Sequence, residues 1–137
     1  MPEPLKNAFF VSSRASQQFI DITGQVQTWI DRSGVKNGVC FLFLPHTTAA
    51  LTLNENWDPA VPSDILYTLE HQTAPSSPAH MHEEGNSPAH VRSSLFGASQ
   101  TLLIEDGRLV LGSWQGVFLA EFDGPRERRV LIKLMQG

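Results

Sequence analysis

The C-terminal third of this chain alternates strand-length apolar runs with short turns, and this pattern limits the fold more than any other feature. The runs are TLLIE at 101–105, RLVLGSW at 108–114, GVFLAEF at 116–122 and RRVLIKLM at 128–135. Asp106-Gly107 separates the first two, and such a pair favours the tight turn of a β-hairpin because glycine accepts positive φ. Asp123-Gly124-Pro125 marks the next reversal. The pattern predicts consecutive antiparallel strands at this end of the chain.

The N-terminal half contains four more apolar runs of strand length. They span residues 8–13, 18–23, 38–44 and 49–55. Several of the predicted strands lack clean alternation between apolar and polar residues. This favours burial on both faces of the strand, by a second sheet, by helices or by a partner subunit.

Three helices are expected between the strands. The first covers about 24–33, where Val26, Trp29 and Ile30 fall on one stripe before Gly34. The second begins near Asp58-Pro59, although Pro62 leaves open a regular start at Ser63.

The third predicted helix has Ser87 as its N-cap, Pro88 as its first residue and Gly97 just beyond its end.

The order of elements indicates an α+β fold in one compact domain, 1–137, with mostly antiparallel sheet layers and about three helices. Residues 71–89 form one long irregular stretch, and a loop of that length is either functional or disordered.

Composition excludes several classes of protein. The 137 residues are 41% hydrophobic and 18% charged, which is typical of a globular domain. A net charge of −4 gives no general attraction to nucleic acid or acidic lipid. The apolar stretch AFFV near the N-terminus is too short for a signal peptide, and no run approaches the roughly 20 residues of a membrane helix. We therefore expect a cytoplasmic protein with no nucleic-acid or membrane partner, in which the single Cys40 is buried as a small apolar residue.

Three of the five histidines are candidate metal ligands because they lie where the chain is expected to turn. His46 follows a predicted buried strand, His90 lies in the first turn of the third predicted helix, and His82 precedes it across a Gly-Asn turn. Neutral imidazoles favour zinc or another late first-row divalent ion over Mg²⁺. Three protein ligands would leave a position open for water or substrate, as in a catalytic site. The H-x7-H spacing alone matches no compact zinc motif, and a histidine bonded to a backbone group in a turn remains the alternative.

Glu121 is a second anomaly, because it shares a strand face with Val117 and Leu119. A buried carboxylate is costly unless it is paired. It is either half of an ion pair with Arg126 or Arg128, or a functional group that acts as a general base or orients a histidine.

Further polar residues are candidate contacts to an anionic substrate, and His90 is a candidate catalytic residue beside Glu121. The candidate substrate contacts lie at element boundaries, in the third predicted helix or in the short basic cluster near the C-terminus. The candidate substrate contacts are Thr47, Thr48, Ser93, Gln115 and Arg126.

Three segments together resemble the YjbQ family, also called the secondary thiamine-phosphate synthase family. They are HTTAALTLNENWDP, HEEGNSPAHVRSSLFG and GRLVLGSWQGVFLAEFDGPRERRV, which follow in order over nearly the whole chain. The resemblance implies an α+β fold that assembles as a homotrimer, with a metal site at subunit contacts. It places the family's recurring histidines on His46, His82 and His90 and its acidic strand residue on Glu121. Arg92 is a departure, since relatives often carry lysine there.

The resemblance also implies a weak activity that joins hydroxymethylpyrimidine diphosphate to a thiazole phosphate, giving thiamine phosphate and pyrophosphate. Displacement of pyrophosphate usually calls for Mg²⁺ held by carboxylates, whereas a histidine cluster is a softer site. We therefore expect a metal-dependent enzyme acting on a small phosphorylated substrate, with the thiamine reaction as a side activity. The alternatives are a non-catalytic trimeric module that binds an anionic metabolite or a metal, and a trimer in which the histidines only bond across subunits.

Overall fold

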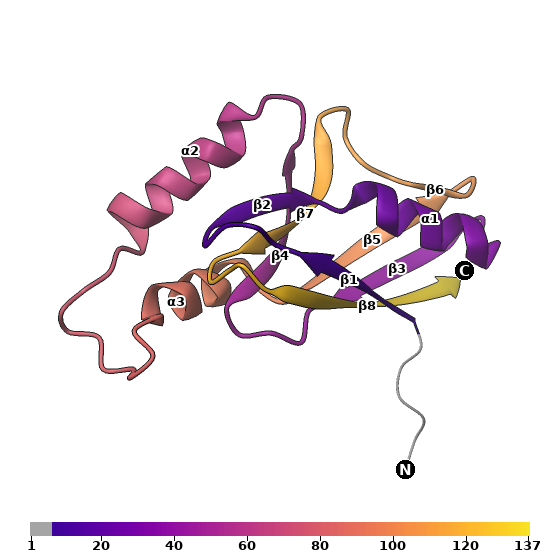
Figure 1. Ribbon diagram of the computed structural model, residues 1–137. Helices are drawn as coiled ribbons and strands as arrows, with labels where there is room; N and C mark the ends of the chain where they lie inside the picture. The colour runs from indigo at the N-terminus through magenta and orange to yellow at the C-terminus, as the bar shows by residue number, and fades with distance from the viewer. Residues whose placement is uncertain (1–6) are drawn as a thin grey trace, which may run out of the picture.

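The computed structural model describes residues 7–137 and forms eight strands and three α-helices, the second of which continues as a π-helical turn (Figure 1). In chain order the elements are β1 (Ala8–Ser12), β2 (Gln18–Asp21), α1 (Thr23–Ser33), β3 (Gly38–Phe43), β4 (Ala49–Glu55), α2 (Ala60–Thr68), η1 (Leu69–Thr73), α3 (Ser87–Phe96), β5 (Ser99–Glu105), β6 (Arg108–Leu109), β7 (Gln115–Glu121) and β8 (Glu127–Gln136). The α+β class and the antiparallel C-terminal strands are confirmed.

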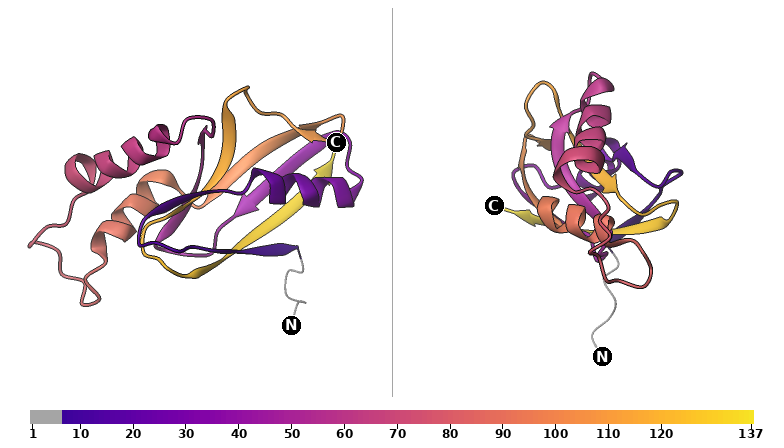
Figure 2. Two further views of the ribbon diagram at one scale, coloured as in Figure 1. Left: turned by 45° about the horizontal axis from the view of Figure 1, so that its top comes forward. Right: turned by 90° about the vertical axis from the view of Figure 1, so that its left-hand side faces the viewer.

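The strands form two antiparallel sheets. One sheet has five strands in the order β1-β8-β3-β5-β6, and the other has three in the order β2-β7-β4. Helix α1 lies at one end of the molecule and helices α2 and α3 lie at the other, as the views in Figures 1 and 2 show. Residues 7–137 contain no helix that is long and apolar enough to cross a bilayer.

The main core lies between the two sheets and α1. It includes Val26 and Ile30 of α1, Leu42 of β3, Leu119 of β7 and Val130 of β8, all at most 1% exposed. The apolar stripe predicted for the first helix therefore packs as expected.

The opposite face of the three-stranded sheet is covered too, by α3 and η1. Small residues form this contact: Ala50 of β4, Ala89 of α3 and Ala120 of β7 belong to one buried cluster with Leu69 and Phe122. Because alanine side chains are short, the helix backbone can approach the sheet closely. The two-sided cover explains why strand β7 lacks alternation, since every residue from 116 to 121 is buried.

Several element boundaries differ from prediction, among them the following three. The strand predicted at 108–114 ends at Leu109, because the chain leaves the edge of the five-stranded sheet there and crosses to the other sheet. The second helix continues through η1 to Thr73, so the irregular stretch begins later than predicted. Ser87 is the first residue of α3 and Asn86 is its N-cap, so the predicted cap is wrong by one position. The Asp106-Gly107 turn is confirmed, with φ of 51° and 76° at its two residues.

Strand β3 lies between β5 and β8, and Gly38 at its start tolerates no side chain. A Cβ there would lie 1.9 Å from the backbone oxygen of Met135. We expect Gly38→Ala to lower the free energy of unfolding by about 1–3 kcal/mol, the usual cost of an overpacked site. Denaturant unfolding measures the difference.

Gly24→Ala in α1 is the matched control, because its Cβ would meet nothing within 4 Å. It should leave stability unchanged or raise it by up to about 1 kcal/mol, since alanine has the higher helix propensity. Equal losses in the two variants would contradict the packing at Gly38.

Candidate functional site

A polar cavity of about 430 Å³ opens where several chain segments end. It is lined by the β3–β4 loop, the segment before α3, the start of α3 and the β7–β8 connection. The residues are Pro45, His46, Thr47, Thr48, His82, Glu84, Asn86, His90, Asp123, Arg126 and Arg128. All three predicted histidines are therefore in one place.

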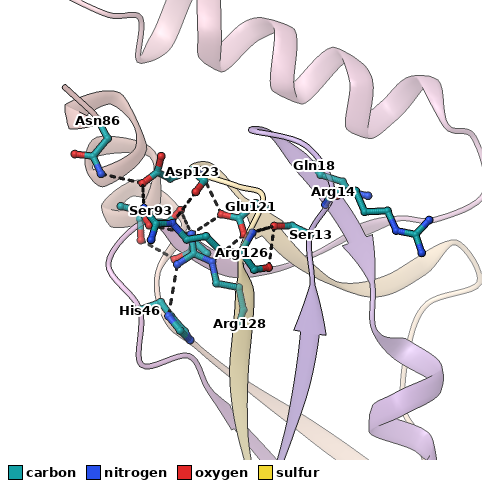
Figure 3. A network of polar contacts seen from close by, with 12 residues as sticks. Ser13, Arg14, Gln18, His46, Asn86, Ser93, Glu121, Asp123, Arg126 and Arg128 are labelled. Atoms are coloured by element: carbon teal, nitrogen blue, oxygen red, sulfur yellow. Dashed lines mark hydrogen bonds and ion pairs between the residues drawn. The ribbon is translucent and has the colours of Figure 1, made fainter. Parts of the chain in front are cut away.

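Beneath the cavity lies a buried ion pair between Glu121 and Arg128 (Figure 3). Their side chains are 0% and 4% exposed. Glu121 is the last residue of β7 and Arg128 the second of β8, so the short reversal between these strands brings the two together. Arg128 Nε donates to one carboxylate oxygen at 2.8 Å, and Nη2 donates to the other.

Two further donors complete the shell of Glu121. Ser13 Oγ donates to Oε1 at 2.7 Å, and the backbone N–H of Asp123 donates to Oε2 at 3.0 Å. Burial on its own raises the pKa of a carboxyl, but the bonds from Arg128, Asp123 and Ser13 outweigh it and hold the pKa of Glu121 below its usual range. Each oxygen accepts two hydrogen bonds, so the geometry favours the ion-pair alternative over a general base. The partner is Arg128, whereas Arg126 pairs with Asp123.

The ion pair fixes the guanidinium of Arg128 at the cavity wall. Nη2 also donates to Thr48, to Oγ1 at 2.9 Å and to the backbone oxygen at 3.2 Å. Within residues 7–137, the one hydrogen-bonding neighbour of Nη1 is Nδ1 of His46, at 3.5 Å. Glu121 is thus a positioning residue that acts through Arg128.

The protonation of His46 follows from its neighbours. The backbone N–H of Arg129 lies 2.9 Å from Nε2 and can only donate, so Nε2 carries the lone pair and a neutral ring carries its hydrogen on Nδ1. Burial, and then the positive charge of Arg128, lower the pKa of His46, so the ring is neutral at pH 7. The Nδ1–H of His46 and the Nη1–H of Arg128 are therefore two adjacent donors, with no acceptor between them.

The other two histidines form a pair. The rings of His82 and His90 are perpendicular, with centroids 5.1 Å apart, and His82 Nε2 lies 3.9 Å from Oε1 of Glu84. His46 lines the same cavity but is not part of this pair, and its Nε2 accepts the backbone N–H of Arg129. Over residues 7–137, no group of three or more His, Cys, Asp or Glu side chains is placed to hold a metal ion.

Three of the five predicted substrate contacts line the cavity: Thr47, Thr48 and Arg126. The other two do not. Ser93 lies on the buried side of α3, where its hydroxyl donates to the backbone oxygen of Ala49 in β4 at 2.7 Å. Gln115 begins β7, at the opposite end from Glu121, and accepts a bond from the N–H of Gly112.

Five lining residues were not among the predicted site residues: Pro45, Glu84, Asn86, Asp123 and Arg128. A signal for Arg128 was present in the sequence. It alternates with Val130 and Ile132 on the buried face of β8, so a charged residue occupies an apolar position just as Glu121 does. Two opposite charges at such positions on successive strands indicate a buried pair.

Known proteins resemble this chain over nearly its whole length. The family model described as UPF0047 protein YjbQ-like matches residues 7–137. A UPF0047 protein of Methanocaldococcus jannaschii is 46% identical over 125 residues, which cover 91% of this chain and 90% of the relative. The YugU protein of Bacillus subtilis is 42% identical, with 91% and 95% covered. A crystal structure of a YjbQ/UPF0047 family protein from Clostridium acetobutylicum superposes with a TM-score of 0.90 at 47% identity, covering 93% of this chain and 98% of that one.

The buried pair makes stability depend on pH. In Glu121→Gln the charge of Arg128 stays buried without its partner, which costs about 3–5 kcal/mol at pH 7. Because the folded pKa of Glu121 is lowered, its stabilisation is complete above the unfolded pKa of about 4.3 and is lost as pH falls through the folded value. Denaturant unfolding from pH 7 to pH 3 should show the gap between wild type and variant closing below about pH 4.

Glu127→Gln is the control, since Glu127 is exposed one residue before Arg128. The free energy of unfolding of Glu127→Gln should change with pH from 7 to 3 as that of the wild type does. A gap for Glu121→Gln that stays constant with pH would show that the carboxylate charge is not what stabilises the fold.

Proposed function

We propose a function for this chain on the premise that it belongs to the UPF0047 protein YjbQ-like family, which the match over residues 7–137 shows. The proposed function is that of an enzyme acting on a small phosphorylated substrate, whose phosphate binds in the cavity beside Arg128. One observation carries this proposal: the neutral His46 and the fixed Arg128 present two N–H donors 3.5 Å apart without an acceptor.

An anionic oxygen suits this position for a physical reason. Two donors that face each other repel unless an acceptor lies between them, and charge-assisted bonds from a guanidinium to phosphate are among the strongest in proteins. The ion pair with Glu121 holds the guanidinium in place, so little side-chain freedom is lost on binding. Thr47 and Arg126 line the same cavity and add a hydroxyl and a second cation.

The catalytic part of the proposal rests on His90. It lines the cavity from the first turns of α3, and an imidazole near neutral pH can transfer a proton to or from a bound substrate. The family resemblance suggests thiamine-phosphate synthesis as a secondary activity. In that reaction a carbon–oxygen bond to the pyrophosphate breaks while a bond from the thiazole nitrogen to that carbon forms.

The alternative is a non-catalytic module that holds an anionic metabolite. The same two donors support it, because they explain binding and not turnover. Incubation with a cell metabolite extract separates the two: an enzyme consumes a phosphorylated compound, whereas a binding module is only stabilised by it.

We propose further that the site binds a divalent metal ion, with zinc as the first candidate. The closeness of the His82 and His90 rings supports it, since both could direct a nitrogen at one ion. His46 as third ligand would first have to release the N–H of Arg129 from Nε2. A bound zinc would polarise a substrate oxygen or activate water.

We also propose a cytoplasmic homotrimer. The outer face of the five-stranded sheet supports assembly, because it exposes large apolar side chains that a monomer would leave in water. They are Phe10, Phe41, Phe43, Leu103 and Met135, each between 40% and 59% exposed.

Phosphate binding is tested by His46→Gln. The glutamine Oε1 can still accept the N–H of Arg129, but the donor at the Nδ1 position is lost. We expect the affinity for inorganic phosphate, measured by calorimetry, to fall about 10- to 100-fold, as for one hydrogen bond to a charged group. His80→Gln, in the exposed loop, is the control. Unchanged affinity in His46→Gln would remove the basis of the proposed function.

Metal binding is tested by His90→Ala. Purified without chelators and then supplied with zinc, the wild type should retain about one ion per chain by elemental analysis, and the variant should retain far less. His71→Ala, which lies outside the cavity, should behave as the wild type. Equal and negligible zinc in all three proteins would refute the zinc component.

A further inference from the structure

Arg92 is a buried cation that the proposed site does not use. It lies on α3, is 5% exposed, and donates through Nε and Nη2 to a single acceptor, the backbone oxygen of Ala74, at 3.2 and 3.0 Å. Its Nη1 makes no hydrogen bond within residues 7–137 and is not among the buried polar atoms that lack a partner, so this N–H group is accessible to a ligand.

The charge of Arg92 is not balanced by an ion pair. Buried charges are normally paired, as Arg128 is with Glu121. Glu70 is near enough to favour the charged form of Arg92, but within the part of the chain that the structure describes no carboxylate comes within 4.0 Å of this guanidinium. A buried guanidinium with free donors and no counter-ion is a binding position for an anion.

A cavity gives an anion access to Arg92. It has a volume of about 250 Å³ and is lined by Ser76, Gly85, Asn86, Pro88, Ala89, Arg92, Phe122 and Asp123. Asp123 would repel an anion, but its carboxylate is already compensated by Arg126, whose Nη2 lies 3.0 Å from Oδ2, and by Asn86 Nδ2 at 2.9 Å.

This second cavity adjoins the first. Asn86 and Asp123 line both, so the hydrogen bond between them forms the common wall. The Oδ1 of Asn86 is buried, and no group of the described residues 7–137 donates a hydrogen bond to it. An acceptor without a partner at this wall suits a hydroxyl or amino group of a molecule that reaches from one cavity into the other.

We propose that Arg92 forms a second anion subsite, and that the substrate is a small molecule with two anionic groups. One group, a phosphate, binds at His46 and Arg128, and the other, a phosphate or carboxylate, binds at Arg92. The first subsite rests on the proposed function, whereas the Arg92 subsite stands on its own contacts.

Calorimetric titration with inorganic phosphate at fixed ionic strength tests the two subsites separately. The wild type should bind two phosphates per chain, and Arg92→Gln and His46→Gln should each bind one. Arg108→Gln, an exposed arginine on β6, should bind two. If Arg92→Gln binds as many phosphates as the wild type, the inference is overturned while the proposed function stands. If only Arg92→Gln loses a phosphate, the Arg92 subsite stands and the proposed phosphate site fails.

The bridging substrate is tested with alkane diphosphonates of increasing chain length. One length should bind about tenfold or more tightly than inorganic phosphate, and either variant should abolish that gain. No gain at any length would overturn the two-anion substrate.

A purely structural role for Arg92 makes a different prediction. If the guanidinium only holds the oxygen of Ala74, Arg92→Gln lowers the unfolding temperature equally with and without phosphate, and this result would contradict the subsite. We expect instead a larger difference in phosphate than in sodium chloride of equal ionic strength, and Arg92→Lys should recover part of the phosphate effect.

Discussion

The buried pair between Glu121 and Arg128 is the interaction on which the functional end of the molecule depends. It joins the end of β7 to the start of β8, and through Ser13 and Thr48 it ties in the segments after β1 and before β4. Such a pair contributes little to stability beyond what apolar residues would provide. Its effect here is on geometry, because it fixes a cation at the wall of a polar cavity.

Periodicity predicted most of the fold because the two sheets are built from apolar runs with clear turns between them. The strand at Ala49–Glu55 has the predicted bounds, and the Asp106-Gly107 turn was readable from its glycine. The failures have local causes. The edge strand β6 is short because the chain changes sheets after Leu109, which no residue pattern marks.

The site was only partly readable from the sequence. The three histidines at expected chain turns were predicted to lie together, and all three line the cavity. The tautomer of each histidine could not be predicted from the sequence. That of His46, for example, depends on the N–H of Arg129, 83 positions away. Gln115 and Ser93 do not line the cavity. The sequence could not show this, because a polar residue at a strand end or on a helix can face either a cavity or the backbone behind it.

The close packing of α3 on the three-stranded sheet has a consequence for the shape of the cavity. The distance between His90 and the opposite wall of the cavity depends on how closely α3 packs on the sheet. The small side chains of Ala50, Ala89 and Ala120 form this contact. One added methyl group at these positions would displace the helix and widen the entrance without touching any polar group. The width of the first cavity therefore depends on residues that do not line it.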